Sequence, residues 1–130
     1  MAKDKRILIV DDDITLRKAL EGKLKKAGFS VVQASDGEEG LELAEEKKPD
    51  LILLDIVMPR MDGMTMLTKL RSAEWGKDMP VIILTSLSDA MRITAAMQQD
   101  TFDYLVKSDW SIDGIVQEVK ERLHMEGSRS

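Results

Sequence analysis

Four short apolar segments recur along the chain, and each ends at a polar side chain that can take part in chemistry. The segments are Ile7–Val10 before Asp11, Leu51–Leu54 before Asp55, Val81–Leu84 before Thr85, and Tyr104–Val106 before Lys107. Buried parallel strands form such continuous apolar runs, and open α/β sheets bind ligands beyond the carboxyl ends of their strands. The pattern therefore predicts that carboxylates, a hydroxyl group and an amine converge at one edge of a parallel sheet.

Segments with helical periodicity separate these runs, as expected for repeated βαβ units of the α/β class. In the first segment, Leu16, Leu20 and Leu24 recur at i, i+4 spacing as far as Gly28, which suits a left-handed helix cap. Capping residues indicate where later helices begin. The further elements that we predict are a strand at Phe29–Ala34, a helix at about 63–72, and helices that start near Asp36, Ser88 or Asp89, and Ser111.

The length of 130 residues suits one domain, which we place at residues 1–125 with a short tail at 126–130. The apolar content of 43% is ordinary for a globular protein, and the apolar stretches are far shorter than the ~20 residues that span a bilayer. Because the amino-terminal residues lack a secretion signal and the chain has no cysteine, we expect a cytoplasmic protein. The net charge of −5 argues against direct contact with nucleic acid.

The aspartates at 11–13 and Asp55 indicate a metal site. Carboxylates that are held close together repel one another, and a hard dication such as Mg²⁺ removes this repulsion by taking oxygen ligands. Such a pocket suits phosphoryl chemistry, because Mg²⁺ keeps several waters and also binds phosphate. Asp55 stands alone at its strand end, as a nucleophile that forms an aspartyl phosphate would. Lys107 can offer positive charge and Thr85 a hydroxyl hydrogen bond to phosphoryl oxygens.

Four sequence motifs follow one another along the chain at these strand ends. They are Val10-Asp11-Asp12, the string D-x-x-M-P-x-M-D-G at 55–63, Leu84-Thr85-Ser86, and Tyr104-Leu105-Val106-Lys107. Their order and spacing resemble those of bacterial two-component receiver domains, including the chemotaxis regulators, from about Arg6 to Leu123. The resemblance implies a single doubly wound (βα)5 domain of the flavodoxin-like fold, with a five-stranded parallel sheet of strand order 2-1-3-4-5.

Carried over by position, the resemblance assigns a metal site and a phosphorylation site. Asp55 would be the phosphoacceptor. Asp12 and Asp55 would bind Mg²⁺, or Mn²⁺ in its place, as direct ligands. Asp11 would act through water, and Val57 would contribute its backbone carbonyl.

The resemblance also implies a phosphorylation switch rather than an enzyme with an external substrate. Lys107 and Thr85 would bind the phosphoryl group, and Thr85 and Tyr104 would form a switch pair that responds to it. The phosphodonor would be a sensor histidine kinase or a phosphotransfer protein. The surface of helix four, strand five and helix five would then meet a downstream protein or a second copy of the chain, without contact to a membrane.

Two departures from the family pattern lead to specific predictions. Ser108 follows Lys107 where the family has proline, and a cis bond costs about 3–4 kcal/mol without proline against about 0.5–1 kcal/mol before it. We therefore expect a trans Lys107–Ser108 bond, with the lysine placed by a longer loop. Val57 and Leu87, each two residues beyond a motif residue, are apolar and cannot orient an attacking water. We therefore expect slow self-dephosphorylation.

A phosphatase of the haloacid-dehalogenase type is the main alternative, because residues 11–15 also match its D-x-D-x-T string. In that interpretation Asp11 is the nucleophile and Asp13 the general acid of a Mg²⁺-dependent enzyme. Such enzymes need a further strand with an acidic pair after the lysine, but the residues after Lys107 predict one helix and a tail. A phosphate-independent binding module of the same fold is a third alternative, which the complete set of acid, threonine and lysine disfavours.

Overall fold

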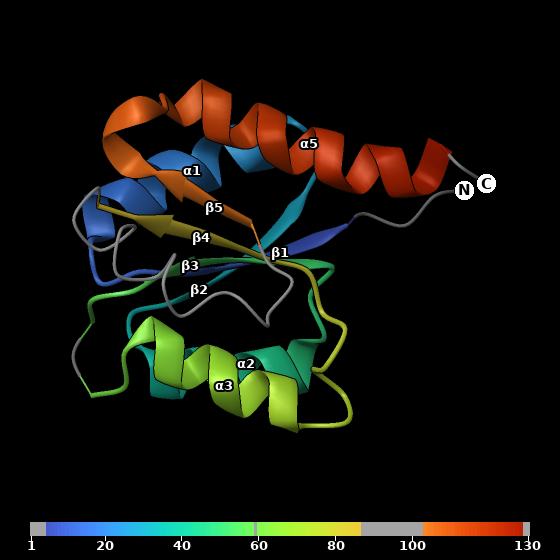
Figure 1. Ribbon diagram of the computed structural model, residues 1–130. Helices are drawn as coiled ribbons and strands as arrows, with labels where there is room; N and C mark the ends of the chain where they lie inside the picture. The colour runs from blue at the N-terminus through green and yellow to red at the C-terminus, as the bar shows by residue number, and fades with distance from the viewer. Residues whose placement is uncertain (1–4, 59, 87–102, 129–130) are drawn as a thin grey trace.

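Strands and helices alternate along the chain as the hydrophobic pattern predicts (Figure 1). The computed structural model describes residues 5–58, 60–86 and 103–128, without the side chains of 103–104 and 124–128. Its elements are β1 (Arg6–Val10), α1 (Ile14–Lys26), β2 (Ser30–Ala34), α2 (Gly37–Lys47), β3 (Leu51–Asp55), α3 (Gly63–Ser72), β4 (Val81–Thr85), β5 (Asp103–Val106), a 3₁₀ turn (Lys107–Asp109) and α5 (Ile112–Ser128). The helix that we expected near Ser88 and Asp89 lies outside the described residues.

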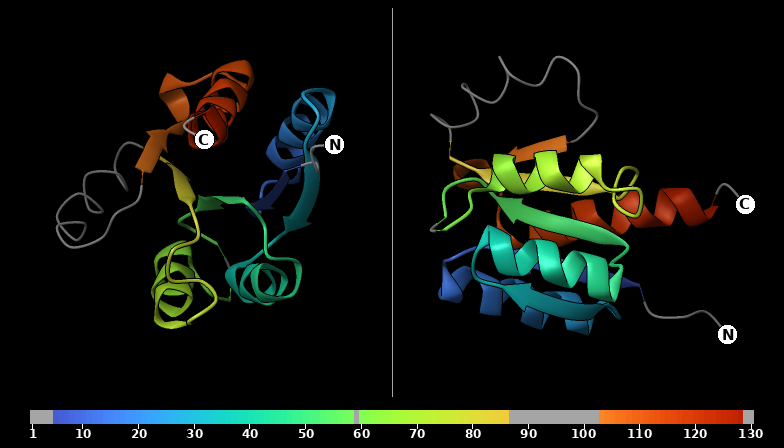
Figure 2. Two further views of the ribbon diagram at one scale, coloured as in Figure 1. Left: turned by 90° about the vertical axis from the view of Figure 1, so that its right-hand side faces the viewer. Right: turned by 90° about the horizontal axis from the view of Figure 1, so that it is seen from below.

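The strands form one parallel five-stranded sheet of order β2-β1-β3-β4-β5, which confirms the predicted doubly wound fold. Helices α1 and α5 cover one face of this sheet, and α2 and α3 cover the other (Figures 1 and 2). β2 lies on one side of β1, and the chain then returns to place β3 on the other side of β1. The direction in which strands are added therefore reverses at β1. Ligands of such sheets bind at this reversal, beyond the carboxyl ends of β1 and β3.

The apolar runs are continuous because both faces of the sheet are buried. Alternate residues of β1 and β3 point to opposite faces, so that Leu8 and Leu54 pack with α2 and α3, whereas Ile9 and Leu53 pack with α1 and α5. All four of these side chains are at most 1% exposed. Burial of each such side chain contributes about 1.5–3 kcal/mol to folding, which keeps the strand ends in fixed positions.

Polar side chains define the helix ends close to the site. Asp36 caps α2 by accepting a hydrogen bond from the Glu39 amide at 2.9 Å, and Ser111 accepts one from the Gly114 amide at 3.0 Å, as the capping analysis predicts. Gly28 has the predicted left-handed conformation after α1, with φ of +101°. Helix α5 continues to Ser128, beyond residue 125, and the division between domain and tail remains a prediction. Among the described helices, none combines the length and hydropathy that crossing a membrane requires.

Candidate functional site

Three predicted acidic residues meet where the strand order reverses. Asp11 and Asp12 follow β1, and Asp55 is the last residue of β3, the neighbouring strand. One carboxylate oxygen from each residue lies within 4.8 Å of the other two. Asp11 and Asp55 are buried, with 1% and 7% of their surface exposed, whereas Asp12 is open to solvent. A cluster of oxygen ligands with one open side can hold a divalent cation.

Lys107 brings a positive charge to this cluster from the 3₁₀ turn after β5. Its Nζ lies 3.1 Å from Asp11 Oδ2 and 3.3 Å from Asp55 Oδ1. No cis peptide bond occurs among the described residues, so the Lys107–Ser108 bond is trans, as predicted. The turn that replaces the family's proline step therefore still directs the amine to the carboxylates.

The charges at the site are not balanced among the described residues. Burial, and after it the Asp11 carboxylate, raise the pKa of Asp55 from 3.8 to about 6, against the opposing effect of Lys107. Burial lowers the pKa of Lys107, but the carboxylates of Asp55 and Asp11 outweigh this effect and raise it above 10.5. One ammonium group thus faces several carboxylates. A dication would remove the remaining repulsion.

Thr85 ends β4 beside the acidic cluster, next to the β3 strand that carries Asp55. The residue is 1% exposed, and its Oγ1 has no hydrogen-bond partner within the described residues. A buried hydroxyl without a partner costs about 1–3 kcal/mol, so this group can donate to an acceptor that the described residues do not supply. Tyr104 lies in β5 in register with Ile83 of β4, but its side chain lies outside the described part of the chain, and the switch pair stays a prediction.

The β3–α3 loop closes over the end of β3. The Gly63 amide donates a hydrogen bond to the Ile56 carbonyl at 2.8 Å, and a Cβ atom at position 63 would lie 2.1 Å from the Asp55 backbone oxygen. Glycine is therefore required at the end of the D-x-x-M-P-x-M-D-G string. Val57, whose carbonyl is a predicted metal ligand, lies in this loop with its side chain 59% exposed.

Sequence analysis missed Arg17, which supports the acidic cluster from the first turn of α1. Its Nη1 donates to the Asp11 backbone oxygen at 2.5 Å, and its Nε donates to Gln33 Oε1 of β2 at 3.0 Å. The signal for this residue was its position in the first turn of the helix that directly follows the aspartates. Asp13, by contrast, caps α1 through the Thr15 and Leu16 amides.

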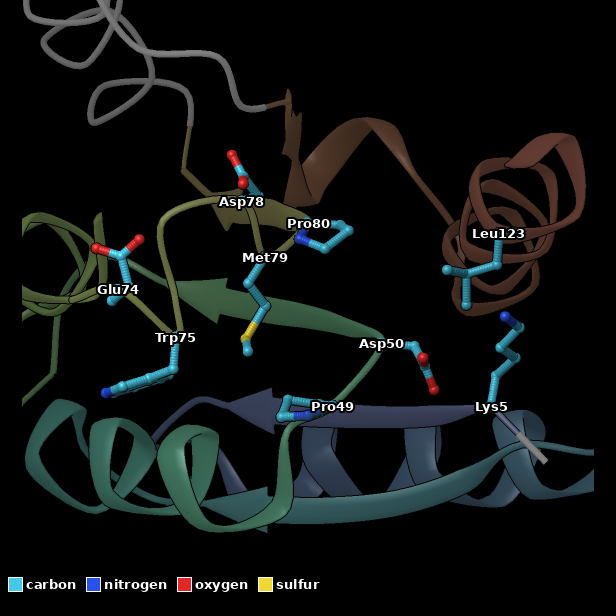
Figure 3. A pocket seen from close by; sticks show the side chains of 9 residues that line it. All are labelled: Lys5, Pro49, Asp50, Glu74, Trp75, Asp78, Met79, Pro80 and Leu123. Atoms are coloured by element: carbon cyan, nitrogen blue, oxygen red, sulfur yellow. The ribbon is translucent and has the colours of Figure 1, made fainter. Parts of the chain in front are cut away.

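A hollow of about 430 Å³ lies near the amino-terminal ends of the strands, away from the acidic cluster (Figure 3). It is lined by Lys5, Pro49, Asp50, Glu74, Trp75, Asp78, Met79, Pro80 and Leu123. Asp50 already accepts a hydrogen bond from the Arg6 amide at 2.7 Å, and Met79 points into the hollow. None of the predicted site residues lines it.

Comparison with known proteins agrees with this geometry. Residues 7–120 match the model of the response regulator receiver domain family. The chain belongs to this family. The receiver domain is 41% identical over 102 residues to a probable transcriptional regulator, ycf27, of Guillardia theta, covering 78% of this chain and 39% of the relative. The chain thus spans about half or less of the length of the curated relatives it matches.

Solved structures of receiver domains have the same fold. A putative response regulator from Chloroflexus aurantiacus is 34% identical, with a TM-score of 0.81 over 92% of this chain and 97% of the other. The chemotaxis response regulator CheY4 of Vibrio cholerae is 26% identical, with a TM-score of 0.82 over 92% of this chain and 98% of the other. The predicted resemblance to receiver domains is therefore confirmed, and the phosphatase alternative is set aside.

Proposed function

We propose that this receiver domain is a Mg²⁺-dependent switch in which Asp55 accepts a phosphoryl group from a histidine kinase or a phosphotransfer protein. The observation that carries the proposal is the placement of Asp55. Its buried carboxylate lies at a strand end, 3.3 Å from the Lys107 ammonium and within 4.8 Å of oxygens of Asp11 and Asp12. A nucleophile, a cationic group and a set of metal ligands therefore converge on one small space.

The residues present fit a hard dication. Asp12, Asp55 and the Val57 backbone carbonyl would hold Mg²⁺, or Mn²⁺ in its place, directly, and Asp11 would act through a bound water. All of these ligands are oxygen atoms, which Mg²⁺ prefers, and the raised pKa of Asp55 indicates repulsion that a cation relieves. When bound, the ion neutralises negative charge on the transferring phosphoryl group.

The chain's own residues then have separate roles in the transfer. An Asp55 oxygen forms a bond to phosphorus as the phosphorus–nitrogen bond of a phosphohistidine breaks, and the electron pair of that bond returns to the donor imidazole. Lys107 pairs with one phosphoryl oxygen, and the Thr85 hydroxyl donates to another. Because Val57 offers no polar group to orient water, the aspartyl phosphate hydrolyses slowly. A phosphoryl half-life of seconds would contradict this.

Phosphorylation would act on partners through the β5–α5 side of the domain. Movement of Thr85 toward the phosphate, coupled to Tyr104, would favour one of two arrangements of this side. A downstream protein or a second copy of the chain would recognise that arrangement. Several relatives are named transcriptional regulators, and in such a protein this domain would control the output without touching nucleic acid itself. We place the domain in the cytoplasm, where its phosphodonor would act.

Mass spectrometry after incubation with Mg²⁺ and a small acyl-phosphate donor tests the proposal. Wild type should gain one phosphoryl group, and Asp55→Asn should gain none. Asp11→Asn should still acquire label on Asp55, at a lower rate because its metal site is weakened. Loss of label in Asp11→Asn together with full labelling of Asp55→Asn would overturn the assignment and favour the phosphatase chemistry.

A further inference from the structure

Arg60 in the β3–α3 loop has an unusual backbone conformation. Its φ is +66°, in the left-handed region that side chains other than glycine rarely adopt. Such a conformation costs on the order of 1–3 kcal/mol and persists where surrounding contacts hold it. Sequence alone gave no reason to single out this residue.

The side chain of Arg60 reaches across to Asp36, the N-cap residue of α2. Its Nε and Nη2 lie 3.0 Å and 2.9 Å from the same oxygen, Oδ2, of Asp36. The other oxygen, Oδ1, accepts the hydrogen bond from the Glu39 amide that caps α2. Asp36 is 4% exposed, and the Glu39 amide and Arg60 hold the pKa of this carboxyl below its ordinary value. Asp36 is thus a buried carboxylate whose oxygens both have partners.

A backbone hydrogen bond next to this ion pair joins the same two segments. The Gly37 amide donates to the Met61 carbonyl at 3.0 Å. A Cβ atom at position 37 would lie 2.3 Å from that carbonyl oxygen, so the approach is closer than other residues allow. Two successive residues at the start of α2, the N-cap Asp36 and Gly37, therefore contact two successive residues of the loop, Arg60 and Met61.

Other described residues of the loop have anchors of their own. Ile56 and Met58 are buried in the core, and Asp62 caps α3 through the Thr65 amide at 2.8 Å. The Val57 side chain is 59% exposed, so this residue depends on its neighbours for the direction of its backbone. The contacts of Arg60 and Met61 with Asp36 and Gly37 lie between these anchors in the sequence and add a further attachment of the loop to the start of α2.

We propose that Asp36 and Arg60 are positioning residues for the metal site, which hold the β3–α3 loop so that the Val57 carbonyl faces the acidic cluster. This inference rests on the proposed function, since it concerns the cation that the function requires. Groups that orient metal ligands from behind typically change metal affinity about 10–100-fold when they are removed. Arg60 is 66% exposed, and pairs with an exposed partner add little to stability. The effect on metal binding should therefore exceed the effect on folding.

Calorimetric titration with Mg²⁺ of the unphosphorylated protein tests the inference without reference to phosphorylation. Asp36→Asn keeps an oxygen for the Glu39 amide and removes the charge. Arg60→Gly removes the guanidinium and also relieves the left-handed backbone, and this relief offsets part of the stability lost when Asp36 loses its cation. We expect both variants to bind Mg²⁺ about tenfold more weakly. Arg60→Lys, which can restore one charged contact, should lie between them and wild type.

The matched control is Asp50→Asn, near the amino-terminal ends of the strands. Asp50 is a half-buried carboxylate that accepts a backbone hydrogen bond, so its substitution changes the same chemistry away from the site. It should lower stability and leave the Mg²⁺ dissociation constant unchanged. Amide hydrogen exchange without metal supplies a second readout, because Gly37 should exchange faster in Arg60→Gly while amides of β1 remain protected.

The outcomes separate the inference from the proposed function. Failure of wild type to bind Mg²⁺ would overturn the proposed function. Wild-type affinity in Asp36→Asn and Arg60→Gly, with normal binding by wild type itself, would overturn only the positioning role. An equal loss of affinity in Asp50→Asn would also overturn it, because the effect would then follow general stability. If Asp36→Asn does not fold, Arg60→Gly alone decides.

Discussion

Replacing Asp55 with asparagine should stabilise the metal-free protein. Burial and the Asp11 carboxylate raise the pKa of Asp55 from 3.8 to about 6, so that ionising this side chain opposes folding at neutral pH. The shift corresponds to about 3 kcal/mol at most. Water on the open side of the site screens the charges, and we therefore expect a gain of about 1–2 kcal/mol. Asparagine is nearly isosteric and carries no charge, so it removes the repulsion without leaving a cavity.

The gain should depend on pH in a defined direction. In the unfolded chain Asp55 loses its proton near pH 3.8, but in the folded protein it does so near pH 6. Between these values the folded state binds more protons, and the wild type loses stability as the pH rises. The difference between Asp55→Asn and wild type should be small below about pH 4. It should grow through this window and stay constant above about pH 6.

Urea unfolding in the presence of EDTA at pH 4, 5 and 7 measures this difference. For a domain of this length, a gain of about 1–2 kcal/mol raises the melting temperature by about 4–8 °C. Asp78→Asn, at an exposed position, is the control and should show no gain. Added Mg²⁺ should stabilise wild type more than the variant, because the variant lacks one metal ligand. Equal or lower stability of Asp55→Asn at pH 7 in EDTA would refute the reasoning.

Further substitutions test the neighbours of Asp55. Lys107→Ala should lower the free energy of unfolding in EDTA by about 1–2 kcal/mol, because Asp55 then lacks its cation. Lys107→Arg should recover part of this loss in the same urea unfolding assay. Gly63→Ala should destabilise by more than about 2 kcal/mol, whereas Gly22→Ala, with nothing within 4 Å, should stabilise by up to about 1 kcal/mol in thermal unfolding. Arg17→Met should cost about 1–2 kcal/mol in urea unfolding through the lost bond to the Asp11 carbonyl, and an unchanged midpoint would contradict this.

The core strands were predictable because strands that are buried on both faces consist of apolar residues. β1, β3 and β4 are buried on both faces and are therefore apolar throughout, and helix α3 has the predicted bounds of 63–72. Strand β2 lies at the edge of the sheet, is only partly buried and begins at Ser30 rather than Phe29. The order of strands was less accessible, because strand pairing is a long-range property, and it came from the family resemblance.

The acidic cluster was predictable for the same reason as the strands, since residues that follow neighbouring parallel strands must meet at one edge. The contacts behind it were not. The left-handed backbone of Arg60 has no signal in its residue type, and its pairing with Asp36 joins residues far apart in the sequence. The sequence predicts Asp36 as a helix cap, but it does not predict the ion pair of Asp36 with Arg60. Sequence patterns thus locate groups that the backbone direction brings together, but not the side chains that orient them.

The charge imbalance at Asp55 links the stability of the domain to its function. A carboxylate with an ordinary pKa would gain little from a cation, whereas one raised to about 6 gains from any group that neutralises it. Relief of about 1–2 kcal/mol on metal binding corresponds to about a tenfold gain in affinity or more. Lys107 is close enough to hold Asp55 in place. Its single charge does not cancel the repulsion at the site, so a bound cation still gains free energy by relieving the remainder. Complete neutralisation by a second lysine would stabilise the fold and weaken the metal site.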